Sequence, residues 1–165
     1  MGTVANVIVG RATVSAKRPY DEANWGEVGY TEDGVQLAVN PTVEPARVDE
    51  ETADLWENII QAGAEVRITL AEATLENLAL AMCGGDTSVH KTILIGGGTP
   101  QKVGLKLVGT SPDADRTVRT VTVSKAVATG EVEVPFRKGY KHTISAAFRP
   151  IAPDSGDVIN WTDSA

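Results

Sequence analysis

The chain has 165 residues, of which 42% are hydrophobic and 22% charged, and its net charge at pH 7 is −7. This composition predicts a single globular domain over residues 1–165 that buries its core without disulfide or metal support. The acidic balance argues against a nucleic-acid-binding surface, because phosphate binding needs clustered lysine and arginine. The single cysteine, Cys83, excludes an intramolecular disulfide, and we expect neither a signal segment nor a membrane anchor.

The first third of the chain predicts a strand, a loop and a hairpin. Residues 4–14 are rich in valine and alanine and favour a strand. Residues 17–26 are polar and contain proline and glycine, which is typical of a loop. Residues 28–39 predict a hairpin that turns at Asp33-Gly34, because Asp-Gly is a strong hairpin signal.

Residues 40–63 predict a long acidic loop. Two prolines interrupt regular strand pairing, and six acidic side chains stand against one arginine. A polar excursion of this length inside a domain tends to be functional or mobile. The residues that we expect to act as a contact surface are Glu44, Arg47, Asp49, Glu50, Glu51, Asp54, Leu55, Trp56 and Ile59.

A strand passes directly into a helix after this loop. The alternation of Val66, Ile68 and Leu70 predicts a half-buried strand, and a helix is predicted over about residues 70–82. Thr69 and Glu72 have the spacing of a capping box at the switch. The expected apolar stripe that packs the helix consists of Leu75, Leu78, Ala79 and Met82.

The rest of the chain predicts further strands and a polar tail. We expect the tail at residues 150–165, with Val158, Ile159 and Trp161 as docking residues. Alternating or apolar patterns predict strands at residues 89–95, 102–108, 116–127, 131–136 and 140–149. The fold class is therefore mainly β: a β-sandwich or barrel of about eight strands with one flanking α-helix and extended termini.

The sequence contains no motif for catalysis, metal binding or a cofactor. His90 and His142, its two histidines, lie far apart, and no pair of residues has metal-ligand spacing. Residues 96–98 are three glycines without the Lys-Ser/Thr of a phosphate-binding loop. We therefore expect no metal and no cofactor, and a building block or binding module rather than an enzyme.

Several segments together resemble one family. Residues 28–35 are similar to the early hairpin of tail tube proteins from long-tailed bacteriophages, and residues 63–81 resemble their strand-into-helix segment. Residues 117–127 and 129–134 resemble their C-terminal half. The resemblance covers roughly residues 4–150 and rests on the order and spacing of these segments.

The resemblance implies a β-sandwich with a helix, six copies of which form a ring. Stacked rings would make a hollow tube in the virion tail that carries DNA to the host, after synthesis in the bacterial cytoplasm. Residues 40–63 would bridge neighbouring rings. The implied partners are further copies of the chain, a tape-measure protein, and tail terminator and tip proteins.

A conduit for DNA has to let the duplex pass without binding it. Each phosphate neutralised by a lysine adds affinity, so an acidic or small polar lining suits a conduit. We expect the lumen to be lined by Glu131 and Glu133, or by Thr120 and Thr122 with Ser124. The alternatives are a virion decoration domain or another carbohydrate- or protein-binding β-sandwich, and, with less support, a hydrolase.

Overall fold

A computed structural model describes most of the chain, and its described part is mainly β with one helix, as predicted. The described residues are 12–19, 23–46, 56–82, 99–113, 115–132, 139 and 141–165. The elements are β1 (Thr13–Lys17), β2 (Gly26–Glu27), β3 (Thr31–Ala46), β4 (Trp56–Leu70), α1 (Leu75–Ala81), β5 (Lys102–Thr110), β6 (Val118–Thr129), β7 (Ile144–Pro150) and β8 (Ile159–Ser164).

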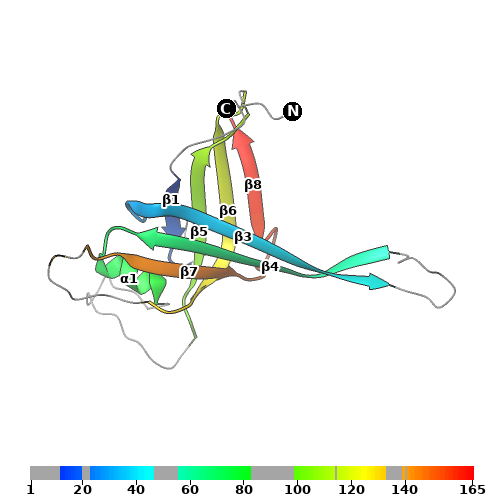
Figure 1. The fold of residues 1–165 in the computed structure, drawn as a ribbon, viewed down its shortest axis with the longest axis horizontal. Helices are drawn as coiled ribbons and strands as arrows, with labels where there is room; N and C mark the ends of the chain where they lie inside the picture. The colour runs from blue at the N-terminus through cyan, green and yellow to red at the C-terminus, as the bar shows by residue number, and fades with distance from the viewer. Residues whose placement is uncertain are drawn as a thin grey trace.

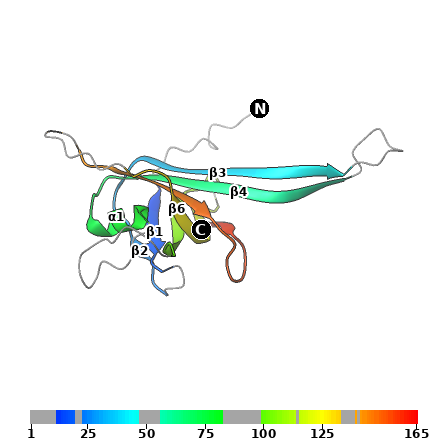
Figure 2. The ribbon, with the colours of Figure 1, turned by 90° about the horizontal axis from the view of Figure 1, so that it is seen from below.

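The strands form one antiparallel sheet that folds over into two layers. Its strand order is β2-β1-β5-β6-β7-β4-β3, and β8 pairs with β6 beside β7. Figure 1 shows β3, β4 and β7 crossing steeply over β5, β6 and β8. In Figure 2 the β3–β4 layer lies on one side of the core, and β1, β2 and α1 lie on the other.

A β-bulge in β6 joins the two layers. The first half of β6, up to Val123, pairs with β8, whereas Ala126 and the residues after it pair with β7. Ser124 and Lys125 stand opposite the single residue Gly104 of β5, where the register shifts. Such a bulge bends a strand, so β6 leaves one layer and enters the other.

The core lies between the layers and is filled by the alternating apolar side chains of the strands. Phe148, Ile68, Leu105 and Ile144 are among its largest fully buried side chains. Leu80 joins them from α1. Among the described residues, no buried polar side-chain atom lacks a hydrogen-bond partner, so this core carries no uncompensated polar group.

The predicted hairpin at residues 28–39 is wrong, because Asp33-Gly34 forms a bulge inside β3. Both residues have positive φ, 59° and 78°, which is the conformation that the Asp-Gly pattern signals. The register shifts between Glu32 and Val35, and Val35 then pairs with Ile68 of β4. The local preference was correct, but the strand's partner lies more than thirty residues further along the chain.

The predicted loop at residues 40–63 is also wrong for its described part. β3 and β4 run through this segment as one long antiparallel pair, from Asn40 opposite Gly63 to Ala46 opposite Trp56. β3 can contain Pro41 and other prolines because it is the last strand in the strand order. The backbone groups on the outer side of such an edge strand need no partner in the ladder of hydrogen bonds. Only residues 47–55 of the predicted loop lie outside the described residues.

The predicted C-terminal tail ends in a strand. β8 pairs with the first half of β6, with Ile159 opposite Val123 and Trp161 opposite Val121. The connection before it is tied to the bulge, where Ser124 N donates to Val158 O at 3.2 Å. Ile159 packs against the core, while the Trp161 side chain is 55% exposed.

The helix is shorter than predicted and begins differently. It spans seven residues, Leu75–Ala81, and Thr74 is its N-cap, with the hydroxyl oxygen accepting from Asn77 N at 3.2 Å. The predicted capping box does not form, because Thr69 belongs to β4 and the Glu72 carboxylate accepts a hydrogen bond from Tyr30 N.

The buried face of α1 differs in part from the predicted stripe. Ala79 is buried, whereas Leu75, Leu78 and Met82 are half-buried. The most deeply buried side chain is Leu80, which the stripe leaves out.

The predicted strand at residues 89–95 lies outside the described residues, as do residues 133–136 of the predicted strand at 131–136. Within that second strand, Glu131 and Val132 are described and follow β6 without strand pairing.

Candidate assembly surfaces

The most prominent surface feature is the long β3–β4 pair. Figures 1 and 2 show its described part projecting beyond the body of the molecule at one end. β3 is sixteen residues long and stands at the end of the strand order, so its outer edge is unpaired within the described residues. Val39 on this strand is 47% exposed. Such an edge is a ready template for pairing with another chain.

The root of this projecting pair is fixed to the start of the helix. Glu72 Oε1 accepts from Tyr30 N at 3.1 Å, and the Asn77 side-chain amide donates to Val28 O and Glu72 O, both at 2.9 Å. A Cβ added to Gly29 would lie 2.6 Å from the Glu72 carboxylate. Gly29 has a φ of +88°, a conformation that favours glycine, so the residue before Tyr30 also suits this contact with Glu72.

The outward face of β3, β4 and β7 is largely polar and locally charge-balanced. Gln36, Arg67 and Ala147 form one cross-strand row on it. Arg67 pairs with Glu65 at 2.8 Å, and this hydrogen bond raises the pKa of the guanidinium. A hollow of about 360 Å³ on this face is also lined by Glu131, one of the predicted lumen residues.

The outward face of β1, β5, β6 and β8 is the second polar surface. Ser15 pairs with Lys106, and Lys106 with Thr122, so their side chains share the face that points away from the core. Thr120 lies on the same face two residues away. Thr120 and Thr122 therefore lie on a different layer from Glu131, and Glu133 lies outside the described residues.

A Lys–Trp–Lys patch, consisting of Lys17, Trp25 and Lys106, lies on this second face. The two ammonium nitrogens stand 4.7 Å and 5.2 Å from the centroid of the Trp25 ring. The ring lies against Gly104, whose added Cβ would be 3.6 Å from it. Each lysine gains a cation–π contact, and the patch holds two positive charges close together on an acidic protein.

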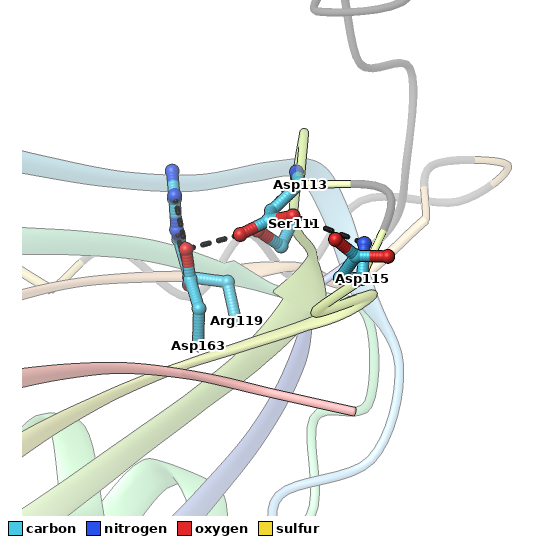
Figure 3. Close-up of polar contacts among 5 residues, drawn as sticks. All are labelled: Ser111, Asp113, Asp115, Arg119 and Asp163. Carbon is cyan, nitrogen blue, oxygen red and sulfur yellow. Dashed lines mark hydrogen bonds and ion pairs between the residues drawn. The ribbon is translucent and has the colours of Figure 1, made fainter.

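A partly exposed ion pair holds β8 to β6, and a second ion pair holds the connection before β8 to the bulge. Arg119 of β6 donates to both carboxylate oxygens of Asp163 at 2.8 Å and 2.7 Å, and Ser111 Oγ contacts the same carboxylate at 2.9 Å (Figure 3). The Arg119 hydrogen bond lowers the pKa of Asp163 to about 2. At the bulge, buried Lys125 pairs with Asp154 at 2.8 Å. Sequence reasoning missed both pairs because their partners are about thirty to fifty residues apart.

The structure describes only some of the predicted contact residues. Glu44 lies in β3, and Trp56 and Ile59 lie in β4. Residues 47–55 lie outside the described part and include the remaining predicted contacts: Arg47, Asp49, Glu50, Glu51, Asp54 and Leu55.

The described residues also form a second hollow, and they contain no metal-ligand cluster. The larger hollow, of about 1240 Å³, opens at the hairpin root and is lined by Arg18, Glu27, Tyr30, Glu72 and neighbouring residues. No group of three or more His, Cys, Asp or Glu side chains in the described ranges is arranged to hold a metal ion. Across the same ranges, no helix has the length and apolar character needed to cross a membrane.

No protein-family model and no curated protein matches the chain.

Proposed function

We propose that this chain is a self-assembling structural subunit, the tail tube protein of a long-tailed bacteriophage, whose stacked rings form a conduit for DNA. The observation that carries the proposal is the projecting β3–β4 pair, in which the sixteen-residue β3 has no partner strand on its outer edge in the described part of the chain. A lone subunit with this edge risks uncontrolled aggregation. A closed ring of identical head-to-tail contacts uses the edge and leaves none free.

The layer of β3, β4 and β7 is the better candidate for the lumen wall. Its outward row consists of the exposed Gln36 and Arg67 and the half-buried Ala147, and Glu65 offsets the Arg67 charge. The other layer carries the Lys–Trp–Lys patch, whose two ammonium groups would attract DNA phosphates. The proposal therefore keeps Glu131 near the lumen and moves Thr120 and Thr122 to the outside.

The alternative function is a carbohydrate- or protein-binding module such as a virion decoration domain. Its support is the pair of exposed aromatic side chains, Tyr30 at 74% and Trp161 at 55% exposure, because aromatic residues are enriched at binding surfaces. This alternative predicts a stable monomer or small oligomer that loses ligand binding on Trp161→Ser. The tube proposal predicts large assemblies from the unmodified chain.

A shortened hairpin tests the proposal. Residues 41–62 are replaced by Asn-Gly, which joins the paired residues Asn40 and Gly63 through a two-residue turn. We expect a folded monomer, because the core residues whose burial the structure describes lie outside the deleted segment. The full chain should sediment as rings or longer assemblies. Assembly of the shortened chain at the same concentration as the full chain would exclude the hairpin from the mechanism. Trp161→Ser serves as the control that should assemble normally.

A further inference from the structure

We propose that the Lys–Trp–Lys patch is the receptor for the acidic segment 44–57 of a second copy of this chain. The inference rests on the proposed self-assembly and specifies the contact between copies. The patch is the one described place where two lysine ammonium groups share an aromatic ring. The described ranges contain no carboxylate paired with either ammonium group, so both charges are available to an incoming anion.

The expected occupant is strongly acidic. Residues 44–57 carry six carboxylates, Glu44, Asp49, Glu50, Glu51, Asp54 and Glu57, against the single Arg47. Opposite charges on two surfaces steer their encounter and fix their register. A net charge of −7 makes copies of the chain repel one another, and a complementary contact offsets part of that repulsion.

The layers of the fold make this contact intermolecular. Val14 and Ala16 of β1 are buried in the core, and the alternating Lys17 therefore faces away from the β3–β4 layer. Figure 2 shows β1 on the opposite side of the body from the β3–β4 pair, which extends outward at one end. A hairpin that leaves one layer and points away from the body meets the patch of another copy rather than its own.

The Trp25 ring gives the patch shape as well as charge. Both ammonium groups stand over this ring, which rests against Gly104. The ring gives the lysine side chains an apolar surface to pack along. The ammonium ends are then positioned before the partner arrives. A pre-positioned pair of charges loses less side-chain entropy on binding than two freely rotating lysines.

A charge swap within the full chain tests the contact. Lys17→Glu with Lys106→Glu reverses the charge of the patch. Glu50→Lys with Glu51→Lys reverses two of the charges in the acidic segment. Each pair alone should raise the protein concentration needed for assembly roughly tenfold, and all four changes in one chain should restore it to within about threefold. Arg149→Glu, at an exposed position of β7 on the other layer, is the charge control and should change it little. Circular dichroism and thermal melting confirm that each variant is folded.

Zero-length carbodiimide cross-linking of mixed ¹⁴N- and ¹⁵N-labelled subunits provides a second readout. We expect cross-links between Lys17 or Lys106 of one isotope and residues 44–57 of the other. Wild-type-like assembly of the patch variant, or cross-links within one isotope only, would overturn the inference and leave the tube proposal standing. Duplex DNA binding that is lost in the patch variant without an assembly defect would assign the patch to nucleic acid instead. Failure of the wild-type chain to assemble would remove the proposed function and this contact together.

Discussion

At the residue scale, the Arg119–Asp163 pair makes stability depend on pH in acid. The pKa of Asp163 is held at about 2, below its ordinary 3.8, by the Arg119 hydrogen bond. A carboxylate whose pKa is depressed by folding stabilises the native state above its unfolded pKa. That contribution is lost as the pH falls from about 4 through about 2. The pair is partly exposed, so the effect should be modest.

The corresponding prediction concerns Asp163→Asn. The variant should melt below the wild type at pH 7, and the difference should shrink as the pH falls and disappear near pH 2. Thermal unfolding measured across this range is the test. Equal melting temperatures at pH 7 would mean that the Arg119 contact does not contribute to stability. Asp113→Asn, on the exposed neighbouring turn, serves as the control.

A second residue-scale prediction concerns the bulge at Gly34. Gly34 has φ of +78° and no atom within 4 Å of an added Cβ, so only backbone strain opposes a side chain there. Gly34→Ala should therefore lower the free energy of unfolding by about 1 kcal/mol. Gly26→Ala is the matched control, because Gly26 has an ordinary φ and its added Cβ meets Ala16 O at 3.7 Å. Urea denaturation measures both, and equal effects would contradict the bulge geometry.

At the element scale, the helix is held by Leu80 more than by the predicted stripe. Leu80 is 1% exposed and fully inside the core, whereas Leu78 is half-buried. Leu80→Ala should cost about 2–5 kcal/mol of stability, since it removes buried methyl groups and leaves a cavity. Leu78→Ala should cost clearly less. Chemical denaturation of the two variants is the comparison, and a larger loss for Leu78→Ala would contradict the observed packing.

Elements whose partners are close in sequence were predictable. The alternation at residues 102–108 and 116–127 identified β5 and β6, because one face of each is buried and the other is polar. The sequence predicted the helix but not its bounds. Thr69 and Thr74 both suit an N-cap, and only the pairing of β4 with other strands assigns Thr69 to β4.

Elements that depend on distant pairing were not predictable. β8 is polar and mostly exposed, so nothing in its sequence marks it as a strand until it lies against β6. The acidic content and prolines of residues 40–63 suggested a loop, whereas pairing with a long partner strand makes the described part of this segment regular. The Lys–Trp–Lys patch joins residues about ninety positions apart, and local patterns do not reveal such a cluster.

At the scale of the whole molecule, the two layers have different roles in the proposed assembly. The β3–β4–β7 layer supplies a long free edge and a charge-balanced outer face. The β1–β5–β6–β8 layer carries the positive patch on its outer face. In the proposed assembly, a second copy of the chain supplies the partner surface for each of these two features.

Negative-stain electron microscopy of the purified full chain across a concentration series tests self-assembly most directly. The account predicts hollow rings at low concentration and stacked tubes of uniform diameter as the concentration rises. Compact single particles at every concentration, including in the presence of an added tail-tip complex as initiator, would contradict it.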